Sequence, residues 1–460
     1  MTDRTLIIET VGKVGETVLL KGWVSSIRAH GKIMFVDLKD RSGVIQVVLA
    51  GSLTEKAKTL RSEFVIEIEG VIKARPASMV NEELETGKIE LEAKELTVLN
   101  ESKTPPFELD KDTSSIDETL RLKYRYLDLR TKRLQHNIKL RSDFVRRVRE
   151  FLFAQEFVEI ETPLLTKSTP EGSRDFIVPS RLQPGKFYAL PQSPQQYKQL
   201  LMTAGFERYF QTARAIRDED LRADRGFEHT QIDIEMSFAE MKDVMGLVEE
   251  MVTTVVEDMG YKIKEKPFPR ITYKESMAKY GADKFDLRTE EDKKNGVLAY
   301  AWVIEFPFFE KTDDGKWTFS HNPFSMPIPE HLGWLLEGKN VDQILTTQYD
   351  LVCNGYESGG GSIRAHKPEI LEATYKVMGY TKKEIDGSVG HMLEAFGLGT
   401  PPHGGIALGI ERSLMNLTGE KYLREVQAFP MTGNGQTSVM DAPSEASPKQ
   451  LKELHLSARC

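Results

Sequence analysis

The sequence contains little that would place the protein outside the cytoplasm or in a membrane. Only two of its 460 residues are cysteines, Cys353 and Cys460, which is too few for a disulfide framework or a cysteine-based zinc site. No apolar run approaches the length of a membrane span, and the N-terminal stretch MTDRTLIIET lacks the basic and apolar regions of a secretory signal. We therefore expect a cytoplasmic protein with no membrane contact.

The sequence also lacks an excess of positive charge. Its formal net charge is −8, which argues against a protein that coats nucleic acid over its whole surface. A local basic groove is still compatible with this total, because electrostatic steering depends on patches of charge. Hydrophobic residues make up 40% of the chain and charged residues 29%, as in ordinary globular proteins. At this length we expect two or three domains.

Residues 1–103 have the pattern of a small all-β domain. Short β-rich runs at 18–24, 34–38, 44–49, 64–72 and 89–99 are separated by turn signals such as His30-Gly31. Five strands in so short a segment favour an OB-fold barrel, a fold that often binds single-stranded nucleic acid, although other small barrels give the same pattern. Residues 104–134 are expected to form a hinge, because Pro105-Pro106 disfavours a helix.

Residues 135–460 mix helical and strand patterns. Apolar residues recur at helical spacing over 135–155, and a second helix is expected over 240–259. Two predicted strands, 213–216 and 231–238, flank the highly charged segment 218–228. Such a loop suits a polar substrate, while an ordinary solvated hairpin tip would have the same composition. Arg217 ends the first of these strands, and its guanidinium can fork onto a phosphate.

Two later stretches carry further strand signals. We expect strands at 284–288 and 301–306, with the short polar segment 289–297 as a surface turn between them. Residues 349–357 are predicted to form one strand carrying Asp350 and Glu357. A separation of seven places these carboxylates on opposite faces, so either Asn354-Gly355 introduces a bulge or only Glu357 faces a ligand. The Gly run at 359–361 permits close approach of the backbone to a ligand.

Three segments together resemble the signature motifs of the class II aminoacyl-tRNA synthetases. The stretch IRDEDLRADRGFEHTQIDIE resembles motif 2, in a form close to that of the bacterial aspartyl enzymes, and GGIALGIER resembles motif 3. The helix at 135–155 and the strand that reaches Pro163 resemble motif 1. The chain departs from the family at Ile216 and His229, where Phe is usual, and at Asn322, where a second His is usual. It also lacks the family's insertion domain, since only 289–297 fills that place.

The resemblance implies an α+β architecture, in which an N-terminal OB-fold anticodon-binding barrel precedes a class II catalytic domain with an antiparallel sheet flanked by helices. It implies ATP-dependent attachment of L-aspartate to tRNA through an aspartyl-adenylate, with ATP as substrate and Mg²⁺ as cofactor. It also implies a homodimer, because motif 1 forms the dimer interface and Pro163 would lie there.

Individual residues acquire roles through the same resemblance. The catalytic residues would be Arg217, Glu219 and Arg412. Aspartate would be bound by Glu171, Gln195, Lys198, Arg217, Asp233, His321 and Arg364. ATP would contact Arg217, Asp218, Glu219, His229, Glu357, Gly409, Ile410, Glu411 and Arg412, and the metal would be held by Asp350 and Glu357. Arg222 and Arg225 would contact the acceptor stem, and Arg28, Phe35 and Gln46 the anticodon.

The choice of tRNA is predicted from two positions in the barrel. In this family, enzymes that aspartylate both tRNA-Asp and tRNA-Asn tend to carry His-Gly where His30-Gly31 stands here, and a small residue where Ser78 stands. We therefore expect the relaxed type, with a strict enzyme for tRNA-Asp as the alternative. An asparaginyl or lysyl enzyme is disfavoured by the cations Lys198 and Arg364. A non-catalytic tRNA-binding paralogue is disfavoured by the retained Arg217 and Arg412.

Overall fold

The computed structural model describes residues 4–168 and 172–457, so Glu171, with its predicted role in aspartate binding, falls outside the described residues. The chain divides into two compact units, with the boundary in the sequence between Ile116 and Asp117. Residues 117–134 were expected to belong to a hinge, whereas the structure places them in the second unit, as two short helices and the start of a long one. Among the described residues, no helix combines the length and the hydropathy needed to cross a bilayer.

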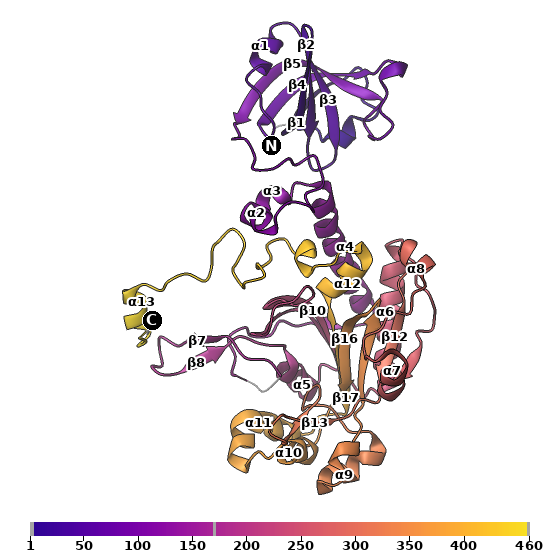
Figure 1. The fold of residues 1–460 in the computed structure, drawn as a ribbon, viewed down its shortest axis with the longest axis vertical. Coiled ribbons are helices and arrows are strands. Elements are labelled where there is room, and N and C mark those ends of the chain that lie inside the picture. The colour runs from indigo at the N-terminus through magenta and orange to yellow at the C-terminus, as the bar shows by residue number, and fades with distance from the viewer. Residues whose placement is uncertain (1–3, 169–171, 458–460) are drawn as a thin grey trace. The chain divides into compact units, whose positions relative to one another are not determined.

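The first unit is a closed five-stranded barrel, as the sequence predicted (Figure 1). Its strands follow the order β1-β2-β3-β5-β4, with β3 and β5 parallel and the other pairs antiparallel. Alternate side chains of each strand point inward and form the apolar core. The elements of this unit are η1 (Ile7–Thr10), β1 (Thr17–His30), β2 (Ile33–Lys39), β3 (Val44–Leu49), α1 (Leu53–Ala57), β4 (Val65–Ala74), η2 (Ala77–Met79) and β5 (Ile89–Asn100).

The second unit is built on an eight-stranded sheet in the order β11-β12-β15-β16-β17-β10-β9-β6. The six central strands are antiparallel, and only the edge strands β11 and β6 pair in parallel, so the expected α+β architecture is confirmed. The strands are β6 (Val158–Glu159), β9 (Arg208–Ile216), β10 (Glu228–Ser237), β11 (Arg270–Thr272), β12 (Tyr300–Ile304), β15 (Gln348–Cys353), β16 (Tyr356–Ile363) and β17 (His403–Gly409).

Helices cover one face of this sheet and bury its main hydrophobic core (Figure 1). The long helix α4 (Lys132–Ala154) packs on α6 (Met241–Asp258) and on α12 (Ile410–Thr418), and apolar residues of all three meet Ile232 and Ile234 of β10. The remaining helices are α2 (Glu118–Lys123), α3 (Arg125–Asp128), α5 (Gln195–Thr203), α7 (Tyr273–Tyr280), α8 (Glu290–Lys294), α9 (Leu332–Glu337), α10 (Pro368–Val377), α11 (Lys382–Phe396) and α13 (Pro448–Glu453).

Two small hairpins and several 3₁₀ turns lie outside the large sheet. They are β7 (Ile177–Pro179) with β8 (Phe187–Ala189), β13 (Phe309–Lys311) with β14 (Trp317–Phe319), η3 (Pro329–His331), η4 (Val341–Gln343) and η5 (Leu423–Val426). The C-terminal segment, yellow in Figure 1, runs to α13 beside β7 and β8, where Arg181 and Glu453 form an ion pair of 3.5 Å.

The prediction of a single strand over 349–357 is wrong. Residues 348–363 form a hairpin, in which β15 and β16 are joined by Asn354 and Gly355 with positive φ angles of 53° and 92°. An Asn-Gly pair between two strands is the strongest short-range hairpin signal, because both residues tolerate the left-handed region that this turn requires. The hairpin places Asp350 and Glu357 on neighbouring strands.

The expected strand at 284–288 is also absent, and 289–297 is more than a turn. Residues 284–288 have no regular secondary structure, while Thr289 caps the short helix α8 by accepting a hydrogen bond from the backbone N–H of Asp292. The irregular segment is fixed instead by Phe285, which is buried, stacks on Tyr280 and accepts a backbone hydrogen bond from Gly355. Residues 284–288 are therefore held by the packing of a buried aromatic side chain, and not by the strand pairing that the sequence predicted.

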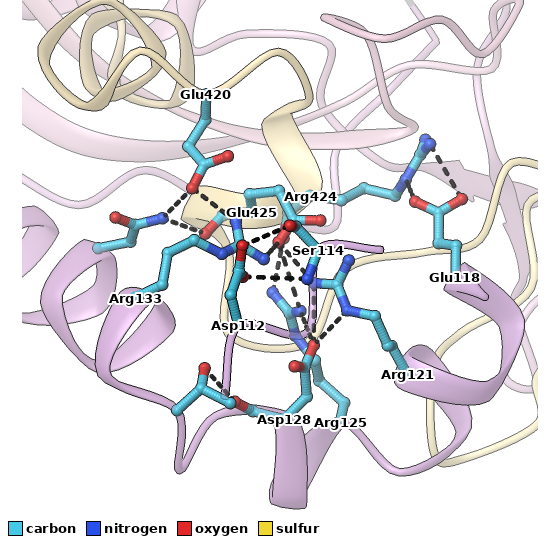
Figure 2. Close-up of polar contacts among 12 residues, drawn as sticks. Asp112, Ser114, Glu118, Arg121, Arg125, Asp128, Arg133, Glu420, Arg424 and Glu425 are labelled. Atoms are coloured by element: carbon cyan, nitrogen blue, oxygen red, sulfur yellow. Dashed lines mark hydrogen bonds and ion pairs between the residues drawn. The ribbon is translucent and has the colours of Figure 1, made fainter. Parts of the chain in front are cut away.

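A network of arginines and carboxylates ties the start of the second unit to its C-terminal part (Figure 2). Glu425 of η5 lies 2.8 Å from Arg121 of α2 and 2.9 Å from Arg133 of α4, while Asp128 binds both Arg121 and Arg125. The Arg125 guanidinium also donates to the backbone oxygens of residues 424, 427 and 428. These groups are mostly buried, so the network fixes residues 117–134 against the segment that follows α12.

We expect Glu425→Gln to lower the free energy of unfolding by about 3–5 kcal/mol, since it leaves buried guanidinium groups without their shared carboxylate. Urea unfolding with an unchanged m value would measure this loss. Glu118→Gln is the matched control, because Glu118 binds Arg424 at the exposed rim and should cost less than about 1 kcal/mol. Equal effects of the two substitutions would contradict a stabilising role of the buried network.

Candidate active site

A pocket lies on the face of β10 that turns away from the hydrophobic core. Along this strand Ile232 and Ile234 point into the core, so Gln231, Asp233 and Glu235 share the opposite face. The neighbouring strands β16 and β17 and the charged loop after β9 complete the pocket. Its lining includes Gln195, Lys198, Arg217, Glu219, Arg225, His229, Asp233, His321, Glu357, Arg364, Gly409, Glu411 and Arg412, which the sequence analysis had selected.

Four buried charges meet at one end of this pocket. The Lys198 ammonium lies 2.8 Å from Asp233 and 3.2 Å from Glu235. The Arg364 guanidinium donates to both carboxylate oxygens of Glu235, at 2.9 and 3.2 Å. Gly405 of β17 makes room for this arrangement, because a Cβ there would collide with the Glu235 carboxylate. Each of the four residues is 2% exposed or less, so their formal charges must balance locally.

The two carboxylates of this cluster are not equivalent. Burial acts to raise the pKa of Glu235, but Arg364 and Lys198 outweigh burial and bring the pKa below its usual value. Burial raises the pKa of Asp233, and Lys198 offsets this only in part. The second carboxylate oxygen of Asp233 and the amide nitrogen of Gln231 are buried, line the pocket and have no hydrogen-bond partner among the described residues.

Two arginines line the other end of the pocket. Arg217 continues from β9, and its Nε donates to the backbone oxygen of Gln192 at 3.3 Å. Arg412 lies in the first turn of α12, after the Gly409 N-cap. It lies 3.3 Å from Asp224 and donates to the backbone oxygen of Glu357 at 3.2 Å. Both guanidinium groups therefore reach the pocket from segments that follow strands of the sheet, and both carry N–H groups suited to phosphate oxygens.

His229 lies between these arginines. Burial lowers the pKa of His229 to about 3, with further contributions from Arg217, Arg412 and Arg214. The imidazole is therefore neutral at physiological pH. A neutral flat ring can stack on a base and can also accept or donate one hydrogen bond.

The hairpin β15–β16 brings Glu357 into the lining of the same pocket, while Asp350 lies on the paired strand outside that lining. Glu357 lies 2.9 Å from Lys284 and 3.7 Å from Arg412; these cations outweigh the effect of burial and lower its pKa to about 2. Asp350 lies deeper, accepts a hydrogen bond from Gln348 and holds the pKa of His321 above its usual value, against the effect of burial.

Some predicted site residues lie outside the pocket lining. Asp218 forms an ion pair of 3.4 Å with Arg174. The backbones of Arg222 and Arg225 form an isolated antiparallel β-bridge within the loop, and the Ile410 side chain belongs to the hydrophobic core. Glu411 lines the pocket but accepts a hydrogen bond from the backbone N–H of Thr230 and pairs with Arg141 at 2.9 Å, which makes its role one of support. Asn322 caps its own turn by accepting a hydrogen bond from the backbone N–H of Phe324.

The barrel has a polar outer face that contains the residues predicted to contact the anticodon. Arg28 pairs in register with Phe35, and Asp37 pairs with Gln46, so all four share one surface while Val36 points into the core. The Arg28 guanidinium donates to Asp37 and to Gln46. Phe35 is therefore an outward-facing aromatic beside hydrogen-bonding groups, an arrangement suited to stacking on a base. His30, the last residue of β1, and Ser78, in η2, are both exposed.

Sequence reasoning missed several residues of the site. Four residues in or beside the pocket carry charge or hydrogen-bonding capacity but were not predicted as site residues: Glu235, Gln231, Asp283 and Lys284. For Gln231 and Glu235 a signal existed, since they alternate with Asp233 along one strand and must share its face. Asp283 and Lys284 gave no local signal, because only the packing of Phe285 brings their irregular segment to the hairpin.

The chain was compared with known proteins. Residues 117–433 match the family of class II tRNA synthetases for D, K and N, and residues 18–99 match the OB-fold nucleic acid binding domain. The chain is 38% identical to an aspartate–tRNA ligase of Geobacillus kaustophilus (96% of each chain covered) and 39% identical to an aspartate–tRNA(Asp/Asn) ligase of Rubrobacter xylanophilus (96% of this chain and 95% of the relative). The first alignment spans 571 positions, so the relative contains a long stretch that this chain lacks.

Solved structures share the fold. An asparaginyl-tRNA synthetase of Entamoeba histolytica, in complex with asparaginyl-adenylate, superposes with a TM-score of 0.73 at 25% identity, covering 90% of this chain and 95% of that one. A putative aspartyl-tRNA synthetase of Leishmania major superposes with a TM-score of 0.76 at 21% identity, covering 94% of each chain.

The pKa of His229 leads to a prediction about acid stability. A histidine whose pKa is lower in the folded than in the unfolded chain makes unfolding bind protons, so its contribution to stability is lost as pH falls from about 6.5 toward 3. We expect the melting temperature of His229→Phe to fall less than that of the wild type over this range, as measured by calorimetry. The exposed His136→Phe should follow the wild type; an identical pH profile for His229→Phe would contradict the lowered pKa of His229.

Proposed function

Because the chain belongs to the class II tRNA synthetases of the aspartate, lysine and asparagine group, and within it to the aspartate–tRNA ligases, we propose that it forms an aspartyl-adenylate in this pocket and charges both tRNA-Asp and tRNA-Asn. Neither the intermediate nor the second tRNA follows from family membership alone. The proposal rests on the hydrogen-bonding capacity of the pocket and on the surface of the barrel.

The observation that carries the choice of amino acid is a count of donors at the buried charge cluster. An ammonium has three N–H donors, and Lys198 uses two of them on Asp233 and Glu235. A guanidinium has five, and the hydrogen bonds of Arg364 to Glu235, Ser362 and Gly405 use four. Lys198 and Arg364 therefore each have one N–H group that donates to no described residue. A side-chain carboxylate can accept from both, whereas the NH₂ group of a carboxamide would face a donor.

The rest of the amino acid also finds complementary groups. The unpartnered oxygen of Asp233 can accept from an α-ammonium, and the unpartnered amide nitrogen of Gln231 can donate to a carboxylate or to the carbonyl derived from it. Gln195 lines the same end of the pocket. These contacts would hold the α-carboxylate toward Arg217, which is the geometry needed for attack on a phosphate.

The reaction would proceed in two transfers. The α-carboxylate of aspartate attacks the α-phosphorus of ATP, the bond to the bridging oxygen breaks, and pyrophosphate leaves. The terminal ribose hydroxyl of tRNA then attacks the acyl carbon, and AMP leaves. Arg217 would stabilise the charge on the α-phosphate and Arg412 that on the leaving pyrophosphate, so catalysis depends on positioning and charge rather than on a side-chain nucleophile. His229 would stack on the adenine, and Glu219 would contact the base or the tRNA end.

The residues at the phosphate end fit a divalent cation. Asp350 and Glu357 lie on paired strands, and carboxylate oxygens are the donors that Mg²⁺ prefers. Gly360 keeps space for Asp350, since a Cβ there would lie 2.8 Å from the Asp350 oxygen. Asp350 and Glu357 would hold Mg²⁺, which supplies charge neutralisation for the phosphates.

The choice of tRNA would depend on the loop between β1 and β2. His30 ends β1, and Gly31 turns the chain with a φ angle of 61°, so the His30 side chain stands exposed near the polar outer face of the barrel. The anticodons of tRNA-Asp and tRNA-Asn differ in their third base, C or U. A histidine that can donate or accept a hydrogen bond would tolerate both pyrimidines.

We expect aspartate, and not asparagine, to drive ATP–pyrophosphate exchange. Gln231→Met should raise the KM for aspartate about tenfold or more, because a hydrogen bond to a charged group contributes about 1.5–3 kcal/mol. It should change the melting temperature little, since the amide nitrogen that it removes has no partner and the side chain loses only its hydrogen bond with His229. Asn416→Leu is the control, as it removes another unpartnered buried amide nitrogen outside the pocket. Exchange driven equally well by asparagine would refute the assignment.

Parallel charging of purified tRNA-Asp and tRNA-Asn tests the relaxed specificity. A single base contact discriminates by about 1–3 kcal/mol, so we expect the wild type to charge both tRNAs with comparable kcat/KM and His30→Leu to favour tRNA-Asp by up to about a hundredfold. Lys56→Leu, on the exposed surface of α1, should change neither ratio. A wild-type preference for tRNA-Asp of about a thousandfold would show the strict enzyme instead.

A further inference from the structure

The irregular segment that carries Asp283 and Lys284 lies beside both carboxylates of the hairpin β15–β16. One ligand atom each of Asp283, His321 and Asp350 lies within 4.8 Å of the other two. The next residue, Lys284, places its ammonium 2.9 Å from the carboxylate of Glu357. Asp283 therefore lies beside Asp350, and Lys284 lies beside Glu357. Two consecutive residues of opposite charge are each next to a different candidate metal ligand.

This segment is held firmly in place. Phe285 is buried and stacks on Tyr280 with ring centroids 4.4 Å apart, and its backbone oxygen accepts a hydrogen bond of 3.0 Å from Gly355. Gly355 belongs to the turn that joins β15 to β16, so the segment and the hairpin keep a fixed relation. The positions of Asp283 and Lys284 beside the carboxylates are thus set by packing and not by chance proximity of mobile side chains.

We propose that Asp283 is a third cation ligand beside Asp350, and that Lys284 is the resident counter-ion of Glu357, which a divalent cation must displace in order to use that carboxylate. This deepens the proposed nucleotide site and rests on it. Asp283 adds a carboxylate oxygen next to a buried carboxylate and an imidazole, a mixed set of oxygen and nitrogen donors that divalent metals accept. The ammonium of Lys284 occupies an oxygen of Glu357 and repels a second cation.

The two residues should therefore act on metal affinity with opposite signs. Removal of the Asp283 charge deletes a ligand and weakens binding. Removal of the Lys284 charge frees Glu357, whose remaining ion pair among the described residues is the longer one with Arg412, at 3.7 Å, and so strengthens metal binding. A residue that only supports the fold would weaken metal binding when it is replaced, so a gain in affinity on losing Lys284 distinguishes the counter-ion role from a structural one.

Mn²⁺ binding to the full-length protein without nucleotide, measured by electron paramagnetic resonance, tests this. We expect Asp283→Asn to raise the Kd for Mn²⁺ about tenfold or more. We expect Lys284→Met to lower this Kd about tenfold. Lys284→Arg keeps the charge and should retain the wild-type Kd. Should Asp283→Asn fail to fold, as judged by circular dichroism, Asp283→Ser takes its place with the same expectation.

The matched controls are Asp314→Asn and Lys316→Met, which break an exposed ion pair of 2.7 Å outside the pocket and should leave the Kd unchanged. An unchanged Kd for Asp283→Asn, an unchanged or higher Kd for Lys284→Met, or a lack of saturable Mn²⁺ binding in the wild type would overturn the proposal. None of these measurements needs aspartate or tRNA. A wild type without aspartate-dependent exchange would refute the proposed function and leave the Mn²⁺ result standing.

Discussion

A balanced set of buried charges on the pocket face of β10 constrains the rest of the catalytic unit. Lys198 from α5 and Arg364 after β16 are buried from solvent. They can stay charged there only because Asp233 and Glu235 lie within hydrogen-bonding distance. The strands must therefore pack closely, and Gly405 is required where the Glu235 carboxylate crosses β17. The same balance prepares the site for a ligand, because the cations are held in place yet keep unused donors for a substrate of matching shape and charge.

The hairpin β15–β16 organises the other end of the pocket. Its turn reverses the chain so that Asp350 and Glu357 stand on adjacent strands, and it also holds Phe285 of the segment that carries Asp283 and Lys284. The end of the pocket that carries Arg412 therefore combines a guanidinium, an ammonium and carboxylates within one rigid frame. Such a set suits a ligand that carries both phosphates and a divalent cation, since neither charge alone would neutralise it.

The surfaces proposed to recognise nucleic acid and small substrates lie on separate units. The barrel presents Arg28, Phe35 and Gln46 on its outer surface, where single-stranded bases can stack and pair, while the large sheet carries the pocket for small substrates. If His30 governs the choice of nucleic acid as proposed, changes in its loop would leave the buried charges of the second unit undisturbed. The lack of an insertion between α7 and β12 removes neither part, because α8 closes that gap within a few residues.

The sequence by itself determined the features that depend on local patterns. Alternating and helical periodicities located the barrel strands, α4 and α6, and contiguous motifs located Arg217 and Arg412, because each such signal lies within one short stretch. Only the tertiary structure decided that Lys198 and Arg364 are paired with Glu235, that the carboxylates of β15 and β16 lie on a hairpin, and that Lys284 neutralises Glu357. These facts depend on contacts between residues far apart in the chain, and burial, which sets their charge balance, is a property of the packed molecule that no local pattern records.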